Sequence, residues 1–223
     1  MKANDKNSTR TTLPLDKQKK HNPPTGSFSS NKWFFIILSA LILFLYIRST
    51  QFDYIGFDDT LMIADHYDYL KDPANIPGAF LHDACKFDNE PGSVCIIYRP
   101  LCTVSVMIDA YFGDRTPRFY HYSNIFYHLL ACISLFYFLV QFGMKDITAK
   151  ALTLLFAIHP VMTMAVAWIP GRTDVLFGLF AILTITHFMK YIAAKSTKSF
   201  LLHLLFFTLA LFSKESGVIL IPI

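Results

Sequence analysis

The chain has 223 residues, of which 53% are hydrophobic and only 16% are charged, and its mean hydropathy is +0.40. A soluble domain carries about 25% charged residues, so this composition excludes an ordinary soluble protein. The net charge of +4 is modest and no basic groove with interleaved aromatic residues is visible, which argues against a nucleic acid partner. Because the apolar residues gather in long runs, the sequence predicts an all-α, multi-pass protein of the lipid bilayer.

The first 32 residues differ in composition from the rest of the chain. They hold seven Lys or Arg residues against Asp5 and Asp16, with Pro, Ser, Thr and Asn between them. Such a segment buries too little apolar surface to fold, so residues 1–32 are expected to be a disordered basic tail. No small-x-small cleavage site follows the next apolar run, which favours an uncleaved first span over a signal peptide.

Five apolar runs are predicted to be spans, at residues 33–47, 120–140, 150–168, 175–194 and 200–212, the third interrupted by Pro160. Residues 48–118 form a large polar loop that is rich in Asp and in turn signals. Within it we expect two short helices, near residues 60–70 and 100–112, the second with the apolar spacing of a helix that lies on a membrane or on other helices. A last apolar run stops at residue 223, so residues 33–223 are expected to be the amino-terminal part of a longer membrane domain.

Charge placement predicts a cytoplasmic amino terminus. With the tail inside and the spans alternating, the inner side carries 12 basic and three acidic residues, and the outer side eight basic and 13 acidic residues. This bias agrees with the positive-inside rule. The loop at 48–118, the segment around residues 159–174 and the Lys214-Glu215 pair then all face the periplasm or the ER lumen.

The cysteines suggest one disulfide and no zinc site. Cys85 and Cys95 lie in the outer loop, in a compartment where disulfides can form, with Cys102 as a competing partner. Cys132 lies within the second span, where packing is the expected role. No Cys-x-x-Cys pattern is present, and we expect neither a cofactor nor a metal site, although the sequence leaves a divalent metal open.

Two adjacent aspartates, Asp58 and Asp59, follow the first span on its outer side. Either can cap a helix that begins near Thr60, since a carboxylate there accepts backbone N–H bonds and suits the positive helix end. The same donors favour the ionised form, and an oriented carboxylate can act as a general base. Capping and catalysis are therefore compatible interpretations of this pair.

Three cations are predicted to face outward with the aspartates. Arg99 either reaches a lipid phosphate or holds a substrate phosphate. Arg172 is expected either in a salt bridge with Asp174 or in an anion clamp. Lys214 and Glu215 interrupt an apolar run, and ionisable residues between spans usually mark function. Together these groups predict a site that binds an anionic phosphate and deprotonates a second group.

Polar residues recur along one face of the second span. His121, Asn124 and His128 have the spacing i, i+3, i+7, so they share a face that should point into the bundle. Hydrogen bonding between helices is the expected role, and metal binding is the weaker alternative. His159, with Asp174 and Glu215, is expected to have a structural or polar role in the bundle.

Six motifs occur in order: the Asp-Asp pair, YRPL, FYHYSNIFYHLL, LLFAIHP, AVAWIPGRTDVL and LFSKESG. In this order they resemble the GT-C membrane glycosyltransferases, in particular the TMTC-like, protein O-mannosyltransferase-related group and its bacterial relatives. The resemblance covers about residues 52–223. It implies a GT-C-like transmembrane helix bundle whose large first outer loop contains short amphipathic helices.

The resemblance also implies a mechanism. A sugar on a polyprenyl phosphate or pyrophosphate carrier is transferred to a hydroxyl of a protein or glycan acceptor on the periplasmic or lumenal face. Asp59, favoured over Asp58, would be the base, and Arg99, Arg172 and Lys214 would contact the carrier phosphate. The overall resemblance favours a bacterial inner membrane, with the ER membrane as the alternative.

Two other functions compete with glycosyl transfer. A multi-pass transporter could bind a lipid phosphate without chemistry, but transporters tend to show inverted repeats, which this sequence lacks. A non-catalytic membrane scaffold would use the aspartates only as caps. One residue departs from the family pattern: Met164 stands where relatives often carry Glu, so any role of that Glu is missing here.

Overall fold

The structure is a computed structural model, and it describes residues 31–56, 58–84 and 97–221. All regular elements within these ranges are helical. Together with the apolar helices described below, this confirms an all-α membrane protein. Most of the predicted basic tail and the predicted Cys85–Cys95 disulfide lie outside the described residues.

Three of the described helices are long and apolar enough to cross a membrane. The first covers Lys32–Gln51 and consists of α1 (Lys32–Tyr46) with a 3-10 turn, η2 (Ile47–Gln51); the other two are α5 (Arg118–Gln141) and α8 (Arg172–Ala194). At 1.5 Å per residue each has the length of about 30 Å that a hydrocarbon core requires. The first, second and fourth predicted runs therefore correspond to long helices.

The predicted third and fifth runs form shorter helices. The third divides at the Pro160 break into α6 (Asp146–Ile158) and α7 (Met162–Ala167). His159 is extended, as the residue before a proline prefers, and this ends α6. The fifth run is α9 (Thr197–Ser213), an apolar helix of 17 residues that pairs with α8.

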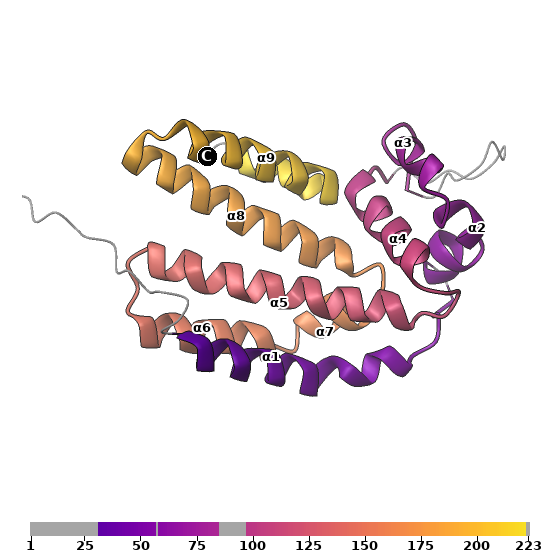
Figure 1. Cartoon of the computed structure of the whole chain (residues 1–223), viewed down its shortest axis with the longest axis horizontal. Coiled ribbons are helices and arrows are strands. Elements are labelled where there is room, and N and C mark those ends of the chain that lie inside the picture. Colours follow the sequence, from indigo (N-terminus) through magenta and orange to yellow (C-terminus); the bar gives the residue numbers. More distant parts are fainter. Residues whose placement is uncertain (1–30, 57, 85–96, 222–223) are drawn as a thin grey trace, which may run out of the picture.

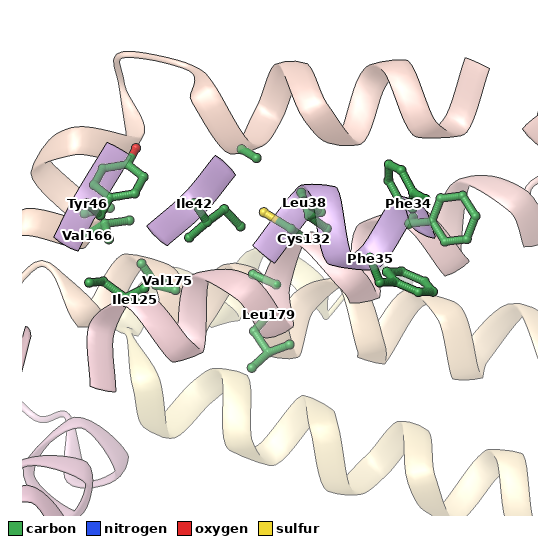
Figure 2. Close-up of a cluster of buried hydrophobic side chains, with 14 of the residues drawn as sticks. Phe34, Phe35, Leu38, Ile42, Tyr46, Ile125, Cys132, Val166, Val175 and Leu179 are labelled. Carbon is green, nitrogen blue, oxygen red and sulfur yellow. The ribbon is translucent and has the colours of Figure 1, made fainter. Parts of the chain in front are cut away.

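The helix α5 occupies the centre of the bundle, with α8 and α9 on one side and α1 and α6 on the other (Figure 1). Figure 2 shows how the inner face of α1 contributes to the core through a row of side chains at helical spacing. The row consists of Phe34, Phe35, Leu38, Ile42 and Tyr46. It packs with buried side chains of α5 and α8, among them Cys132, whose predicted packing role is confirmed.

The outer loop folds into short helices at one end of the bundle (Figure 1). The expected helix at 100–112 is present as α4 (Pro100–Phe112). The expected helix at 60–70 is instead a π-helical turn, η3 (Thr60–Ala64), followed by α2 (Tyr67–Leu70), then η4 (Pro73–Asn75) and α3 (Ile76–Ala79). A second core joins these helices to α5, since it contains Ile63 and Met107 from the loop and Tyr120 from α5.

Candidate functional site

Asp59 is buried at the junction between the first span and the outer loop, with only 1% of its surface exposed. Its Oδ2 atom accepts a hydrogen bond of 2.9 Å from the backbone N–H of Ile55, whereas its Oδ1 atom has no hydrogen-bond partner. The side chain makes no capping bond to η3, so the predicted capping role of Asp59 is wrong. The reason is local: the backbone of Asp59 is already helical, whereas an N-cap residue has a non-helical conformation.

The environment of Asp59 changes the expected electrostatics. Burial raises the pKa of its carboxyl above the ordinary value. The Ile55 amide, and the Trp168 indole, which lies near the carboxylate but outside the geometry of a hydrogen bond to Oδ1, only partly oppose this effect. The nearby charge of Asp58 raises the pKa further. Burial thus disfavours the ionised form of Asp59, whereas the sequence led us to expect that a helix end would favour it; the raised pKa makes the ionised carboxylate a stronger base. Asp58 itself is half-buried.

Arg172, the first residue of α8, is completely buried. Its Nη1 atom donates to Asp109 Oδ2 at 2.5 Å, and its Nη2 atom donates to the Tyr120 carbonyl at 3.0 Å. The second carboxylate oxygen of Asp109 accepts a bond from the Ser123 hydroxyl. The predicted salt bridge between Arg172 and Asp174 is wrong, because Asp109 is the partner. In this arrangement Arg172 also offers no exposed donor to a carrier phosphate.

Asp109 was missed by the sequence reasoning. It lies in α4 among apolar neighbours, and it is 1% exposed. A carboxylate in such a helix is costly unless it is paired, so its position was a signal that a buried cation lies opposite. The sequence does not identify the cation that pairs with Asp109, because the pairing depends on how α4 packs against α8.

The other two predicted cations lie close together where α4 packs against α9, and each is paired with a carboxylate. Arg99 binds Glu215 through two parallel hydrogen bonds, Nε to Oε2 at 2.9 Å and Nη2 to Oε1 at 2.5 Å. Lys214 donates to Asp174 Oδ1. The hydrogen bond with Glu215 raises the pKa of Arg99, and the charge of nearby Asp174 adds to the effect. The structure thus brings Arg99 and Lys214 together, but with their charges neutralised.

Asn124 confirms the prediction that the polar face of α5 points into the bundle. Its Nδ2 atom lies 3.2 Å from the carbonyl oxygen of Val166, 3.0 Å from that of Trp168 and 3.2 Å from that of Ile169. These carbonyls belong to the last turn of α7 and to the residues that follow it, where a helix has no further N–H groups to offer its carbonyls. Asn124 therefore fixes the non-helical segment between α7 and α8 and, with it, the position of Trp168 near Asp59.

The three histidines that the sequence analysis identified lie in different environments. The Nε2 atom of His128 lies 3.2 Å from the Ala157 carbonyl, which confirms the expected bonding between helices. His121 is buried beside Phe52 and neither ring nitrogen has a partner. His159 is exposed rather than in the bundle, and its Nδ1 atom accepts the Val161 N–H in the turn between α6 and α7. Among the described residues no group of three possible metal ligands occurs.

No family model matches the sequence, and no solved structure matches it. Curated relatives do match. The protein O-mannosyl-transferase tmtc2 of Xenopus laevis is 36% identical over 163 residues, which cover 72% of this chain and 19% of the relative. The protein O-mannosyl-transferase TMTC1 of Homo sapiens is 30% identical over 193 residues, which cover 82% of this chain and 22% of the relative. The protein O-mannosyl-transferase TMTC4 of Mus musculus is 29% identical over 211 residues, which cover 83% of this chain and 28% of the relative.

The chain belongs to the TMTC-like, protein O-mannosyltransferase-related family. The resemblance carried by the six motifs is thereby confirmed. The matched part of the chain spans 19% to 28% of the length of these relatives, about a fifth to slightly more than a quarter. Within this TMTC-like chain, Met164 is 69% exposed on α7, so the departure from Glu concerns an exposed position of this short helix.

Proposed function

We propose that this chain acts in glycosyl transfer of the GT-C type, moving a mannosyl group from a polyprenyl phosphate or pyrophosphate carrier to a protein hydroxyl on the periplasmic or lumenal face. The relatives named protein O-mannosyl-transferases support the reaction class and the protein acceptor. The observation that carries the site is the buried carboxylate of Asp59, with one oxygen held by a backbone amide and the other without a partner.

Asp59 is proposed as the general base. Its Oδ1 atom would take the proton of the acceptor hydroxyl, the hydroxyl oxygen would bond to the anomeric carbon, and the carrier phosphate would leave with the electrons of the broken bond. The hydrogen bond from Ile55 to Oδ2 fixes the carboxylate, and the raised pKa increases its basicity. Because Asp59 is only 1% exposed, an acceptor must displace neighbouring side chains to reach it.

Arg99 and Lys214 are proposed to stabilise the leaving phosphate. Both are partly exposed, at 21% and 25% of their side-chain surfaces, and both lie at the outer end of the chain. Stabilising the charge of a leaving group commonly lowers the activation barrier more than most other catalytic effects do. We assign Arg172 instead to the framework, because its guanidinium is enclosed with Asp109.

A transfer assay with two aspartate variants tests this proposal. Membranes containing the protein would be supplied with a radiolabelled polyprenyl-phosphate mannose and a Ser/Thr-containing acceptor peptide. Asp59→Asn should abolish transfer and leave binding of the carrier intact, whereas Asp58→Asn should retain transfer. Asp68→Asn, which changes the charge equally at an exposed loop position, is the matched control. Full transfer by both Asp59→Asn and Asp58→Asn would contradict the base assignment, and carrier binding without transfer by the unmodified protein would favour a transporter.

A further inference from the structure

The carboxylate of Glu215 fills the hydrogen-bonding fork of Arg99. Two nearly parallel bonds join the pair, with Nε–Oε2 and Nη2–Oε1 distances of 2.9 and 2.5 Å. A guanidinium presents the same fork to carboxylates and to phosphates, so the geometry that holds Glu215 also suits a phosphate. One edge of the Arg99 guanidinium, formed by Nε and Nη2, is thus occupied by the protein itself, and a carrier phosphate that bonds this edge must replace Glu215.

The pair lies where an anion from outside can exchange with the carboxylate. The side chain of Arg99 is 21% exposed, and that of Glu215 is 64% exposed. An exposed ion pair contributes little to stability, because water and salt screen it. If Glu215 leaves the fork, its carboxylate can be solvated at once, whereas Asp109 is enclosed and cannot leave Arg172 in this way.

The backbone after α9 holds Glu215 in position. The helix ends at Ser213, Lys214 is extended, and a 3-10 turn, η5 (Glu215–Leu220), then folds back against α9. Gly217 permits this close approach, since a Cβ atom there would lie 2.9 Å from the Cα atom of Leu211. Glu215 is therefore presented to Arg99 by a packed turn, not by a freely moving segment.

We propose that Glu215 is an internal competitor of the phosphate ligand: it occupies the anion site of Arg99 at rest and is displaced when a phosphate monoester or pyrophosphate binds. This inference rests on the proposed assignment of Arg99 to the carrier phosphate. It adds a device by which Arg99 stays neutralised until a phosphate with two negative charges, such as the carrier monoester formed when the sugar leaves, takes the place of the carboxylate.

Binding of geranylgeranyl phosphate to the purified chain in detergent micelles, measured by calorimetry, tests the inference. Glu215→Gln should bind about two- to fivefold more tightly than the unmodified protein, the modest gain expected when a weak exposed ion pair no longer competes. Asp68→Asn is the matched control, since it changes the charge equally and frees Arg115, which lies 2.5 Å from Asp68 at a different place in the outer loop. Its affinity should not change.

Further measurements distinguish binding of the phosphate group from binding of the lipid chain. They also distinguish failure of this inference from failure of the proposed function. Inorganic phosphate should show the same gain in Glu215→Gln, and uncharged geranylgeraniol should show none. Unchanged or weaker phosphate binding by Glu215→Gln, or an equal gain in Asp68→Asn, would overturn the competitor role.

Arg99→Gln should weaken phosphate binding, and the double variant Arg99→Gln with Glu215→Gln should lack the gain in affinity. If Arg99→Gln binds as well as the unmodified protein, the phosphate assignment of Arg99 itself fails. Glu215→Ala also removes the carboxylate, so it repeats the phosphate-binding test with a second substitution at the same position.

Discussion

Arg172 and Asp109 form an ion pair that is enclosed between α4, α5 and α8. Their Nη1 and Oδ2 atoms are 2.5 Å apart, and the two side chains are 0% and 1% exposed. The pair joins the first residue of α8 to the last turn of α4, so it fastens the loop at 48–118 to a long apolar helix. A buried pair is weak evidence for net stability, but removing one partner leaves a buried charge without compensation.

We expect Asp109→Asn to destabilise the protein by about 3–5 kcal/mol, because the guanidinium of Arg172 would stay buried without a counter-charge. Thermal unfolding in detergent measures the effect. The double variant Asp109→Leu with Arg172→Met removes both charges and should recover most of the loss. A single variant as stable as the unmodified protein would show that the pair does not hold the loop in place.

Gly171 lies in the turn before α8, and Gly178 within α8 provides a control for the same substitution. A Cβ atom on Gly171 would lie 2.4 Å from the Met164 carbonyl oxygen, which belongs to rigid backbone, whereas one on Gly178 would meet nothing within 4 Å. Gly171→Ala should therefore cost about 1–3 kcal/mol, as overpacking does. Gly178→Ala should stabilise α8 by up to about 1 kcal/mol. Thermal unfolding of the two variants gives the comparison, and similar midpoints would contradict it.

The pH dependence of transfer should report the raised pKa of Asp59. As the pH falls through this pKa the base becomes protonated, so the rate should decline at a pH above the value of about 3.9 of an ordinary aspartate. The Trp168 indole lowers this pKa, so Trp168→Phe should move the decline to higher pH. Initial rates over a pH series test both points. A decline near pH 4 that Trp168→Phe leaves unmoved would argue against Asp59 as the titrating base.

The Arg99–Glu215 pair should make stability depend on pH in acid. The hydrogen bond from Arg99 lowers the pKa of Glu215 from 4.5 to about 2. A folded-state pKa below the unfolded one gives a contribution that is present above pH 4.5 and is lost as the pH falls toward about 2. The unmodified protein should thus melt slightly above Glu215→Gln at pH 6, and the two midpoints should converge near pH 2. A difference that persists in acid would mean that the pair is not its source.

The sequence by itself determined the class of protein and its family. Hydropathy and helical spacing are local properties, so they were sufficient to predict three long helices, the helix at 100–112, the break at Pro160 and the inward face that carries Asn124. The order of the six motifs was sufficient to predict the family.

Only the tertiary structure decided the partners of the charged residues. Arg172 pairs with a residue 63 positions away, and Arg99 with one 116 positions away, and no local pattern specifies such distant choices. The burial of Asp59, and with it the raised pKa, likewise follows from how the outer loop packs on the bundle. The sequence placed the charges at one end of the molecule, but the electrostatics of each depends on desolvation and on the nearest opposite charge, and both are set by packing.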